Sequence, residues 1–493
     1  MAARATRLSD LGLTARAGRD PALSGITADS RAVRAGMLFA ALPGTAVHGA
    51  KFLSAALEQG AAAVLTDAEG ARLAAEALAE TDVALVVAED PRAALACAAA
   101  LWFGAQPEVM VAVTGTNGKT SVATFTRQIW AALGHEAINI GTTGIEGAWT
   151  APSGHTTPDP VTLQKLLAAA AAGGVTHAAM EASSHGIDQR RLDGVRLVAG
   201  GFTNLTQDHL DYHGTMEAYF EAKAQLFTRL LPEDGIAVVN LDGAKGSDMA
   251  ELALDRGLRV LTVGKGQGAD LQIAATRPDA TGQEVRYLWQ GRAFQTRLAL
   301  IGAFQAENVA VAAGLAIAAG DAPEAVLAVL PQLTGVRGRM QLAATRRNGA
   351  AVYVDYAHTP DALETALKAL RPHVMGRIVV VFGAGGDRDR TKRPLMGAAA
   401  KAHADVLYVT DDNPRTEDPA SIRAAILAAC PEAHEVGDRA EAILRAVDAL
   451  LPGDALLIAG KGHESGQVVG TDVYPFDDVE QASVAVAALD GVI

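Results

Sequence analysis

The stretch Val109-Met110-Val111-Ala112-Val113-Thr114-Gly115-Thr116-Asn117-Gly118-Lys119-Thr120 decides the fold of the region around it. Its apolar run predicts a buried strand, its glycines predict a turn, and the residues from Lys119 onward predict the start of a helix. Backbone N–H groups of such a turn can surround phosphates, Lys119 can reach the terminal ones, and the Thr120 hydroxyl can bind Mg²⁺. The sequence therefore predicts an ATP-binding loop.

This loop departs from the general phosphate-loop pattern at one position. The pattern has glycine six positions before the lysine, where Val113 stands here. The alternative is a glycine turn with an incidental Gly-Lys-Thr, but the strand in front of the turn favours nucleotide binding. The residues expected to bind ATP here are Gly115, Thr116, Asn117, Gly118, Lys119, Thr120 and Ser121.

Beyond the loop, short apolar runs alternate with alanine-rich segments that favour helix, which is typical of an α/β fold with parallel strands and crossover helices. The predicted strands are Val109–Val113, Val175–Met180, Ile236–Asn240, Ala351–Asp355, Ile378–Phe382, Val406–Thr410 and Ala455–Ala459. A chain of 493 residues exceeds the size of one core, so we expect three domains. Their predicted ranges are 1–106, 107–335 and 336–493, with boundaries near Gln106-Pro107 and Gly335–Gly338.

Composition restricts the partners and the compartment. The net charge of -14 argues against a nucleic-acid or membrane-surface partner, and we expect only small-molecule ligands. The first residues lack a secretory apolar core, so no secretory signal is expected, and the apolar runs stop short of the roughly 20 residues that span a bilayer. The two cysteines, Cys97 and Cys430, lie in alanine-rich surroundings and are expected to be buried thiols. A cytoplasmic protein is therefore expected.

Two further segments carry side chains that could hold metal. The predicted strand ending at Met180 delivers Glu181, and such strand ends gather ligands in open α/β sheets. Residues 204–214, which include His209, are dense in metal-capable side chains. The alternatives are a helix-capping role for Glu181 and a structural role for the histidine. Taken alone, Lys223 resembles an ordinary solvated lysine on a helix.

The run Asp411-Asp412-Asn413-Pro414-Arg415-Thr416 points to a ligand with a free carboxylate. The planar guanidinium of Arg415 offers two parallel hydrogen bonds to such a group, and Arg388 would add a second positive charge. Asp412 and Asn413 could receive an ammonium group on the same ligand. The alternative is a proline turn with an exposed arginine.

Together these motifs resemble the Mur ligases, the ATP-dependent amino-acid-adding enzymes of peptidoglycan precursor synthesis, along nearly the whole chain. The matching stretches are Gly115–Ser121, Thr156-Thr157-Pro158, Glu181–His185, Asn204–Gly214, Lys223, Asn308, Gly338-Arg339-Met340, Asp355-Tyr356-Ala357-His358, Gly385–Pro394, Asp412–Arg415 and Gly460–Glu464. The resemblance implies an N-terminal domain for the UDP end of a substrate, a central P-loop ATPase domain, and a C-terminal Rossmann-like domain that brings the amino acid.

The resemblance also assigns roles to single residues. Lys223 would be carbamylated by CO₂ and, as N6-carboxylysine, would hold a second Mg²⁺, while Thr120 would hold the ion that bridges ATP. The implied catalytic residues are Lys119, Glu181, His209 and Lys223, and the implied metal site is Thr120, Glu181, His209 and Lys223. Further residues that would line ATP are Asn308, Arg339, Asp355 and His358. Gln341 stands where relatives commonly have an acid.

The two other substrates would have sites of their own. The implied site for the UDP-sugar dipeptide is Ser30, Thr45, His48, Thr156, Thr157, Ser184, Gln189 and Arg191. The implied site for the amino acid is Arg388, Asp412, Asn413, Arg415, Gly460 and Glu464.

The expected function is ATP-dependent addition of meso-2,6-diaminopimelate to the D-Glu γ-carboxylate of UDP-MurNAc-L-Ala-D-Glu, through an acyl phosphate and with domain closure, by a monomeric enzyme. Ligases that add L-lysine or D-alanyl-D-alanine, and folylpolyglutamate synthetases, are the enzyme alternatives. A P-loop switch or transport ATPase is the alternative from another class; it would hydrolyse ATP without an amino acid and would not need the motifs after residue 355.

Overall fold

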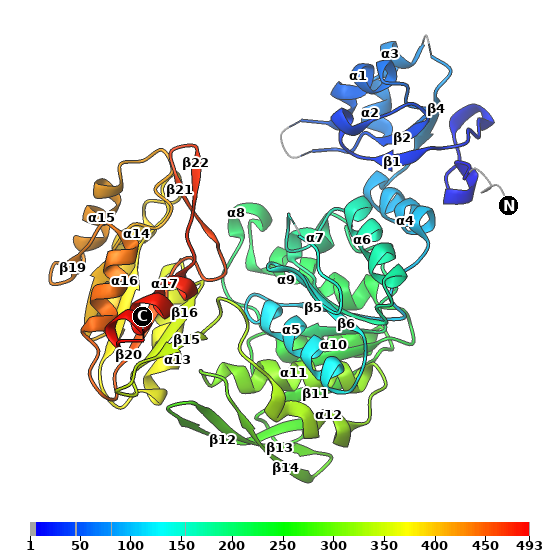
Figure 1. The fold of residues 1–493 in the computed structure, drawn as a ribbon. Helices are drawn as coiled ribbons and strands as arrows, with labels where there is room; N and C mark the ends of the chain where they lie inside the picture. Colours follow the sequence, from blue (N-terminus) through cyan, green and yellow to red (C-terminus); the bar gives the residue numbers. More distant parts are fainter. Residues whose placement is uncertain (1–5, 45–46, 80, 153, 493) are drawn as a thin grey trace. The chain divides into compact units, whose positions relative to one another are not determined.

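The structure is a computed structural model that describes residues 6–44, 47–79, 81–152 and 154–492. The chain forms two compact units, one of residues 1–262 and 311–322 and the other of residues 263–310 and 323–493. The division runs through β11 (Arg259–Gly264) and α11 (Phe304–Ala318). Each unit is an α/β arrangement in which helices accompany the sheets (Figure 1).

The first unit begins with a small parallel sheet in the order β1-β2-β3-β4. Its strands are Gly25–Thr27, Met37–Ala40, Ala63–Thr66 and Ala84–Val87, and the helices of this part are α1 (Leu53–Glu58), α2 (Ala68–Leu73), α3 (Ala75–Ala79) and α4 (Pro91–Phe103). The strands β2 and β3 are almost wholly buried, and Leu38, Ala40, Ala63 and Leu65 share one core cluster with residues of α4.

The larger sheet of the first unit has the order β11-β10-β9-β5-β8-β6-β7. Besides β11, its strands are β5 (Val109–Thr114), β6 (Ala137–Gly141), β7 (Gly144–Gly147), β8 (His177–Glu181), β9 (Ala199–Phe202) and β10 (Ile236–Asn240), and only β7 among them runs antiparallel to its neighbour. The helices of this part are α5 (Lys119–Ala132), α6 (Pro160–Ala172), α7 (Ser184–Asp188), α8 (Leu210–His213), α9 (Met216–Gln225) and α10 (Gly246–Asp255). Because β5 lies between β8 and β9, the loops after these three strands leave the same edge of the sheet.

The second unit contains an antiparallel meander and a second mostly parallel sheet. The meander is β12 (Leu271–Asp279), β13 (Gly282–Trp289) and β14 (Arg292–Leu298), and α12 (Pro323–Val329) follows it in the chain. The other sheet has the order β15-β16-β20-β17-β18-β19 and consists of Gln341–Thr345, Ala351–Asp355, Ala455–Ala459, Ile378–Phe382, Val406–Val409 and His434–Glu435. A hairpin of β21 (Gly466–Val469) and β22 (Asp472–Pro475) extends from the loop after β20.

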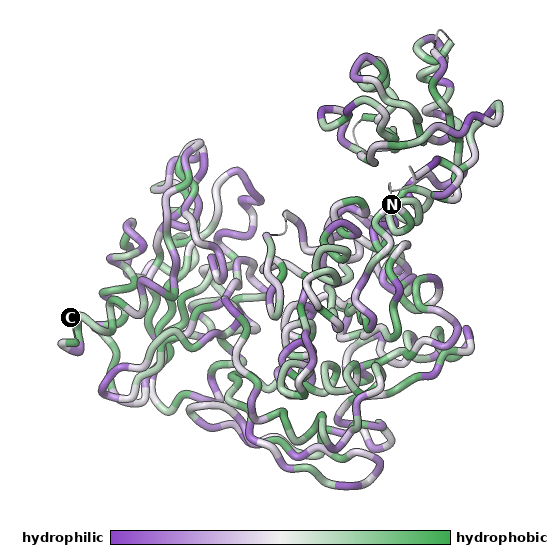
Figure 2. The backbone as a smooth tube through the Cα atoms, turned by 45° about the vertical axis from the view of Figure 1, so that its right-hand side comes forward, coloured by the Kyte–Doolittle hydropathy of each residue, from purple (hydrophilic) through white to green (hydrophobic). Residues whose placement is uncertain are grey.

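Helices cover both faces of this second sheet, so its central strands are apolar on both sides. Val380 and Phe382 share a core cluster with residues of α13 (Pro360–Leu370), α14 (Lys392–His403) and α15 (Pro419–Leu427). Val379 and Val381 point the other way, into a cluster with α16 (Arg439–Asp448) and α17 (Asp478–Leu489). Figure 2 shows many green, hydrophobic stretches of backbone in the part of the chain that ends at the C-terminus. A strand buried on both faces is the usual reason for such an unbroken apolar run.

The predicted α/β class with parallel strands is confirmed, and each of the seven predicted strands is present. The largest shift is at β8, which begins at His177 and ends at Glu181 rather than spanning 175–180. The three domain ranges stay a prediction, because the contacts divide the chain into two units.

One burial prediction was wrong. Cys430 is buried, but Cys97 is exposed, and both are free thiols. Cys97 lies on α4, where the neighbouring Leu95, Ala96, Ala98 and Ala99 are buried. An alanine-rich helix carries little contrast between its two faces, so its sequence does not identify which small residue faces outward. Among the described residues, no helix combines the length and the apolar character needed to cross a membrane.

A fully buried ion pair anchors the second unit. Arg439 and Asp478 are both without exposed side-chain surface, and two hydrogen bonds of 2.8 and 2.7 Å join the guanidinium to the carboxylate. Arg439 also donates to the carbonyl oxygen of Ala459, at 3.0 Å, at the end of β20. The pair therefore ties α16 and α17 to the end of a central strand.

Replacing Arg439 by methionine is expected to lower the free energy of unfolding by about 3–5 kcal/mol, because Asp478 would remain buried without its counter-charge. The double variant Arg439→Met/Asp478→Leu is the matched control and should recover most of that loss. Thermal unfolding followed by circular dichroism measures both. A single variant as stable as the wild-type protein would contradict the prediction.

Candidate active site

The predicted phosphate-binding loop follows β5, and it contains two glycines with positive φ angles. Gly115 has φ 145° and Gly118, the residue before α5, has φ 89°. A Cβ at position 115 would overlap the hydroxyl of Thr203, so the turn requires glycine there. The backbone of the turn leads directly into the N-terminus of α5, which begins at Lys119.

The segment after β9 braces this turn. Asn204 accepts from the backbone N–H of Asn117 at 3.0 Å, and the Thr203 hydroxyl donates to the carbonyl of Asn117 at 2.6 Å. Thr206 N–H donates to the Thr116 hydroxyl at 2.9 Å. The sequence analysis did not assign this bracing role, because the two segments lie about 90 positions apart and only their strand neighbourhood brings them together.

Two lysines converge on one carbonyl oxygen of the turn. Lys119 Nζ donates to Gly115 O at 2.9 Å, and Lys223 Nζ, from α9, donates to the same oxygen at 2.7 Å. Lys223 is only 1% exposed, and its Nζ lies 4.3 Å from the centre of the Tyr219 ring. Burial, and then the charge of Lys119, lower the pKa of Lys223 well below its ordinary value. A buried lysine beside a second cation is not the solvated lysine that its local sequence suggests.

Glu181 ends β8 and lies beside the start of α5. It is 1% exposed, and its carboxylate accepts from the Thr120 hydroxyl at 3.1 Å and from the Thr142 backbone N–H at 2.8 Å. A Cβ at Gly141 would overlap Oε1 of this carboxylate, so the end of β6 leaves room for it. Thr142 was not predicted from the sequence, in which it is the first of two threonines after the glycine that ends β6.

The donor set at this point suits Mg²⁺. A carboxylate and a hydroxyl in contact are hard oxygen ligands, and Mg²⁺ commonly takes one or two such groups beside water and phosphate oxygens. Among the described residues, no three histidine, cysteine or acidic side chains form a ready metal cluster. Thr120 and Glu181 are therefore the protein pair that could hold the ion together with phosphates.

His209 lies just before α8 with φ 52°, and it is exposed. Its Nε2 is 3.5 Å from an Asp208 carboxylate oxygen, and its ring centre is 4.8 Å from that of His185 and 6.2 Å from that of Tyr219. Tyr219 is the same ring that packs on Lys223. His209 thus borders the two-lysine cluster through an aromatic contact.

The predicted threonines of the first unit surround the end of β8. The Thr157 hydroxyl donates to the carbonyl of Glu181 at 2.9 Å, and the hydroxyls of Thr156 and Thr142 are 3.1 Å apart. Arg191 donates to the carbonyl of Thr157 at 2.6 Å. These residues, separate in the sequence, meet beside the buried carboxylate.

Gln189, Arg191 and Ser184 lie in and after α7. The Gln189 amide oxygen accepts from Arg191 at 2.8 Å, and its nitrogen donates to the Tyr212 hydroxyl at 3.3 Å. Ser184 is buried, and its hydroxyl has no hydrogen-bond partner within the described part of the chain.

The N-terminal candidates lie in the small sheet. His48 accepts from the Ala50 backbone N–H at 3.0 Å, and its other ring nitrogen is 3.1 Å from Asp67, so both nitrogens have partners. Ser30 begins a short helical turn, and its carbonyl accepts from Gln59. Thr45 lies outside the described residues. The roles of these three residues stay predictions.

In the second unit, the predicted nucleotide residues lie around the turn at 338–340. Asp355 ends β16 and accepts from the backbone N–H groups of Met340 and Ala357 at 2.7 and 2.9 Å, while burial raises its pKa. The Arg339 guanidinium lies 4.8 Å from the centre of the Tyr356 ring. Gln341 accepts from Gly338 N–H at 2.7 Å, so its amide oxygen performs the capping that an acid could perform there.

Two further nucleotide candidates have local partners. His358 lies 2.8 Å from the carbonyl of Tyr356 through Nδ1, and burial lowers its pKa. Asn308, buried on α11, donates to Gln305 at 3.1 Å.

The candidates for the amino-acid site come from the loops after β17, β18 and β20, which leave one edge of the sheet. Arg415 has φ 52°, and its guanidinium donates to the carbonyl of Gly386 at 2.8 Å. The Asp387 carboxylate, in turn, accepts from the Thr416 hydroxyl at 2.8 Å. Arg388 is exposed and belongs to the same loop as Gly386. The loops that carry the two predicted arginines are therefore joined.

The other members lie next to them. Gly460 has φ 120°, and a Cβ there would lie 2.5 Å from an Asp412 carboxylate oxygen. Asn413 donates to Glu464 at 2.9 Å. Asp412 and Asn413 are each 6% exposed. Lys461 was not predicted as a site residue; it is wholly buried beside Asn413, and its only signal in the sequence is its place between Gly460 and Glu464.

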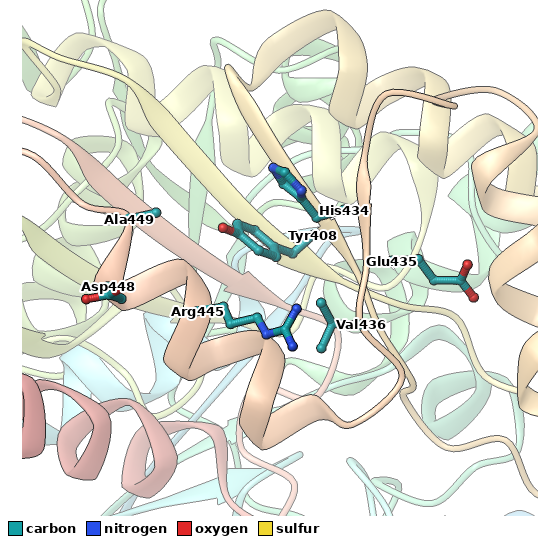
Figure 3. A pocket seen from close by; sticks show the side chains of 7 residues that line it. All are labelled: Tyr408, His434, Glu435, Val436, Arg445, Asp448 and Ala449. Atoms are coloured by element: carbon teal, nitrogen blue, oxygen red, sulfur yellow. The ribbon is translucent and has the colours of Figure 1, made fainter.

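A separate hollow of about 370 Å³ lies on the flank of this sheet (Figure 3). The rings of Tyr408 and His434 lie side by side there, with centres 4.9 Å apart, and Arg445 and Asp448 come from α16. Its lining includes none of the predicted site residues.

Comparison with known proteins gives three family matches in chain order. Residues 22–102 match "Mur ligase family, catalytic domain", residues 113–316 match "Mur ligase middle domain", and residues 338–462 match "Mur ligase, glutamate ligase domain".

Two relatives and one solved structure with the same name are similar to this chain over nearly its full length. UDP-N-acetylmuramoyl-L-alanyl-D-glutamate–2,6-diaminopimelate ligase of Caulobacter vibrioides is 51% identical over 98% of this chain and 99% of its own length. The protein of that name from Brucella melitensis is 50% identical over 94% of both chains. A solved structure with that name is 36% identical, with a TM-score of 0.74 over 98% of this chain and 99% of that one. Mycobacterium tuberculosis folylpolyglutamate synthase complexed with ADP is 19% identical, with a TM-score of 0.61 over 80% of this chain and 93% of its own, and shares the fold alone.

Proposed function

This chain belongs to the Mur ligase family, and from that premise we propose that it is the ATP-dependent ligase that joins meso-2,6-diaminopimelate to the D-Glu γ-carboxylate of UDP-MurNAc-L-Ala-D-Glu in peptidoglycan precursor synthesis. The products are the amide, ADP and phosphate. The single observation that carries the proposal is 51% identity, over nearly the full length of both chains, to a relative named for this reaction.

The first unit supplies the activating half of the reaction. The glycine turn at 115–118 and Lys119 hold the ATP phosphates, since the N–H groups and the ammonium there suit anions. The threonines and Arg191 around Glu181 bind the UDP-MurNAc dipeptide and bring its γ-carboxylate near the phosphates. Mur ligases use ATP and Mg²⁺. Thr120 and Glu181, with His209 and Lys223, would hold Mg²⁺, which neutralises charge on the phosphates when bound.

Lys223 is carbamylated in the active enzyme. Its lowered pKa favours a neutral amine, whose nitrogen can bond to the carbon of CO₂ and lose a proton to give a carbamate. The change puts an anion that can ligate metal beside the Lys119 ammonium, where a protonated Lys223 would be repelled. The approach of both lysine nitrogens to the Gly115 carbonyl oxygen supports this part of the proposal.

The second unit supplies the amine. Arg415, with Arg388 in the neighbouring loop, pairs with the remote carboxylate of diaminopimelate, and the carboxylates of Asp412 and Glu464 receive its remote ammonium. A lysine substrate has no remote carboxylate for an arginine to neutralise, so the presence of Arg415 favours the diacid as the substrate.

The chemistry proceeds in two steps. A γ-carboxylate oxygen attacks the terminal phosphorus of ATP, the bond to ADP breaks, and an acyl phosphate forms. The free amine then attacks the acyl carbon to give a tetrahedral oxyanion, which expels phosphate as the amide forms and a proton leaves the nitrogen. The protein mainly positions and neutralises the reactants.

The test is turnover of the purified protein with ATP, Mg²⁺ and the UDP-MurNAc dipeptide, with each amine in a separate reaction. Phosphate release is expected with meso-diaminopimelate and should be at least about a hundredfold slower with L-lysine at equal concentration, as expected for a charged contact. Faster turnover with lysine or D-alanyl-D-alanine, or ATP hydrolysis that needs no amine, would overturn the proposal. A folate substrate with glutamate tests the folylpolyglutamate alternative in the same assay.

A further inference from the structure

Lys461 is a cation enclosed in the second unit. Its side chain has no exposed surface, and its Nζ donates to Asn413 Oδ1 at 2.9 Å. Nζ also lies 3.4 Å from a carboxylate oxygen of Glu464. Burying an ammonium is costly unless its hydrogen bonds compensate, so this position demands an explanation beyond packing.

The contacts of Asn413 fix the orientation of its amide. Besides Lys461, the backbone N–H of Val468, in strand β21 of the hairpin, donates to the same Oδ1 at 2.9 Å. Both partners can only donate, so this atom must be the oxygen. The amide nitrogen therefore faces the other way and donates to Glu464 at 2.9 Å.

This orientation decides what the pair can offer a ligand. The oxygen of Asn413 is occupied by two donors, whereas the bonds among the described residues use one of the two N–H groups on its nitrogen. Glu464 is 34% exposed at its side chain, so its carboxylate is reachable. Asn413 itself is only 6% exposed, so the pair would offer a ligand one N–H of Asn413 beside the reachable carboxylate of Glu464.

We propose that Lys461 is a positioning residue for the amine substrate, which holds Asn413 as a hydrogen-bond donor and Glu464 as an acceptor beside Arg415. The inference rests on the proposed function. It changes the sequence-based expectation for Asn413, which becomes a partner of the remote carboxylate, while the acids receive the ammonium. Lys461 itself does not touch the substrate.

A contrast with Arg439 separates positioning from anchoring. Arg439 is equally buried and also interacts electrostatically with Asp412 and Glu464, but its hydrogen bonds go to the fully buried Asp478 and to backbone carbonyls. The partners of Lys461 are instead two residues of the amine site, one of them partly exposed. Loss of Lys461 should therefore reduce the preference for the diacid, whereas loss of Arg439 should lower the free energy of unfolding.

The first test is Lys461→Met, which keeps an unbranched chain and removes the charge. We expect the KM for meso-diaminopimelate to rise about tenfold to a hundredfold, because the charged hydrogen bonds from Lys461 to Asn413 and Glu464 are lost. The kcat and the KM for ATP should stay within about twofold of the wild-type values. The preference for the diacid over lysine should fall by the same factor. Lys401→Met, which removes a surface lysine from its pair with Glu432, is the matched control and should change none of these values.

Equal losses with both amines, or a lower kcat at unchanged KM, would overturn the inference. If wild-type protein does not turn over the diacid, the proposed function fails and this inference with it. If the wild-type enzyme prefers the diacid and Lys461→Met keeps the full preference, this inference alone fails.

Asn413→Asp provides a second test that does not depend on the folding of the lysine variant. The substitution keeps the shape but replaces the donating nitrogen by oxygen, so the KM for the diacid should rise at least about tenfold. Adding Lys461→Met to Asn413→Asp should cost less than in the wild-type background, because both changes act on one contact. Unchanged or tighter binding of the diacid by Asn413→Asp would show that Asn413 receives the ammonium, and would refute the inference.

Discussion

Replacement of Lys223 by alanine is expected to lower the rate of ATP-dependent phosphate release about a hundredfold to a thousandfold, in line with the loss of one charge-stabilising group from an active site. Lys223 is buried against the Gly115 carbonyl, and in the proposed enzyme its carbamate is a metal ligand. Alanine would leave a space beside Lys119 and remove that ligand.

The same variant offers a test of carbamylation. A small carboxylate such as acetate could enter the space left by the side chain and supply the missing oxygen ligands. A high concentration of acetate should therefore restore part of the activity of Lys223→Ala. Lys119→Ala is the matched control: it should be comparably inactive, but acetate should not rescue it, because a cation is missing there. Lys165→Ala, an exposed lysine on α6, should retain wild-type activity.

Intact-mass measurement under native conditions gives an independent readout, since the carbamate adds CO₂ to the wild-type chain and not to Lys223→Ala. Full activity of Lys223→Ala without any carboxylate, or equal rescue of Lys119→Ala, would contradict the carbamate assignment.

The seven strands predicted from the sequence all lie in the two mostly parallel sheets, where the strands are largely buried, whereas the β1–β4 sheet and the β12–β14 meander were not predicted. Strands such as Ile378–Phe382 combine an unbroken apolar run with a polar or glycine-rich end, and both signals follow directly from burial and from the ligand-bearing edge. The exposed Cys97 was mispredicted, since its alanine-rich helix lacks contrast between faces.

Site residues could be predicted from the sequence where they belong to a local motif. They could not be predicted where their role depends on a contact between segments that are distant in the sequence. The turn around Lys119 was predicted from its local spacing, whereas the loop at 412–415 left a proline turn open as an alternative and was assigned through the resemblance to Mur ligases. The ligand roles of both stay predictions. The bracing of that turn by Thr203 and Asn204, and the contact of Thr142 with Glu181, depend on strands that become neighbours only in the sheet. Such partners carry no local pattern.

The second large effect is expected at Arg415. Its guanidinium uses one hydrogen bond to hold the carbonyl of Gly386 and has further N–H groups for a carboxylate. Arg415→Ala should raise the KM for meso-diaminopimelate roughly a hundredfold, the equivalent of about 3 kcal/mol for a charge-assisted pair. Turnover with lysine should change only a few-fold, so the preference between the two amines should nearly vanish.

Two variants sharpen the comparison. Arg415→Lys keeps the charge but not the planar pair of donors, so its loss should be intermediate. Arg390→Ala removes a guanidinium from the loop after β17 that is 74% exposed and pairs with Glu417 at 3.2 Å, so it should leave the amine preference intact. If the Arg415 variants lose the preference for meso-diaminopimelate over lysine and Arg390→Ala keeps it, the Arg415 side chain binds the remote carboxylate.

A change of backbone conformation at position 415 is not expected in the alanine variant. Residue 415 has φ 52° in the wild-type protein, and its N–H and C=O bond to Val468 and Gly470 of the hairpin region, so these contacts do not depend on the side chain. Alanine inherits the same backbone conformation that arginine already adopts. A fall in activity with both amines, together with an earlier thermal transition, would instead indicate that the guanidinium serves mainly to join its loop to Gly386, and the assignment of diacid selection to Arg415 would then be wrong.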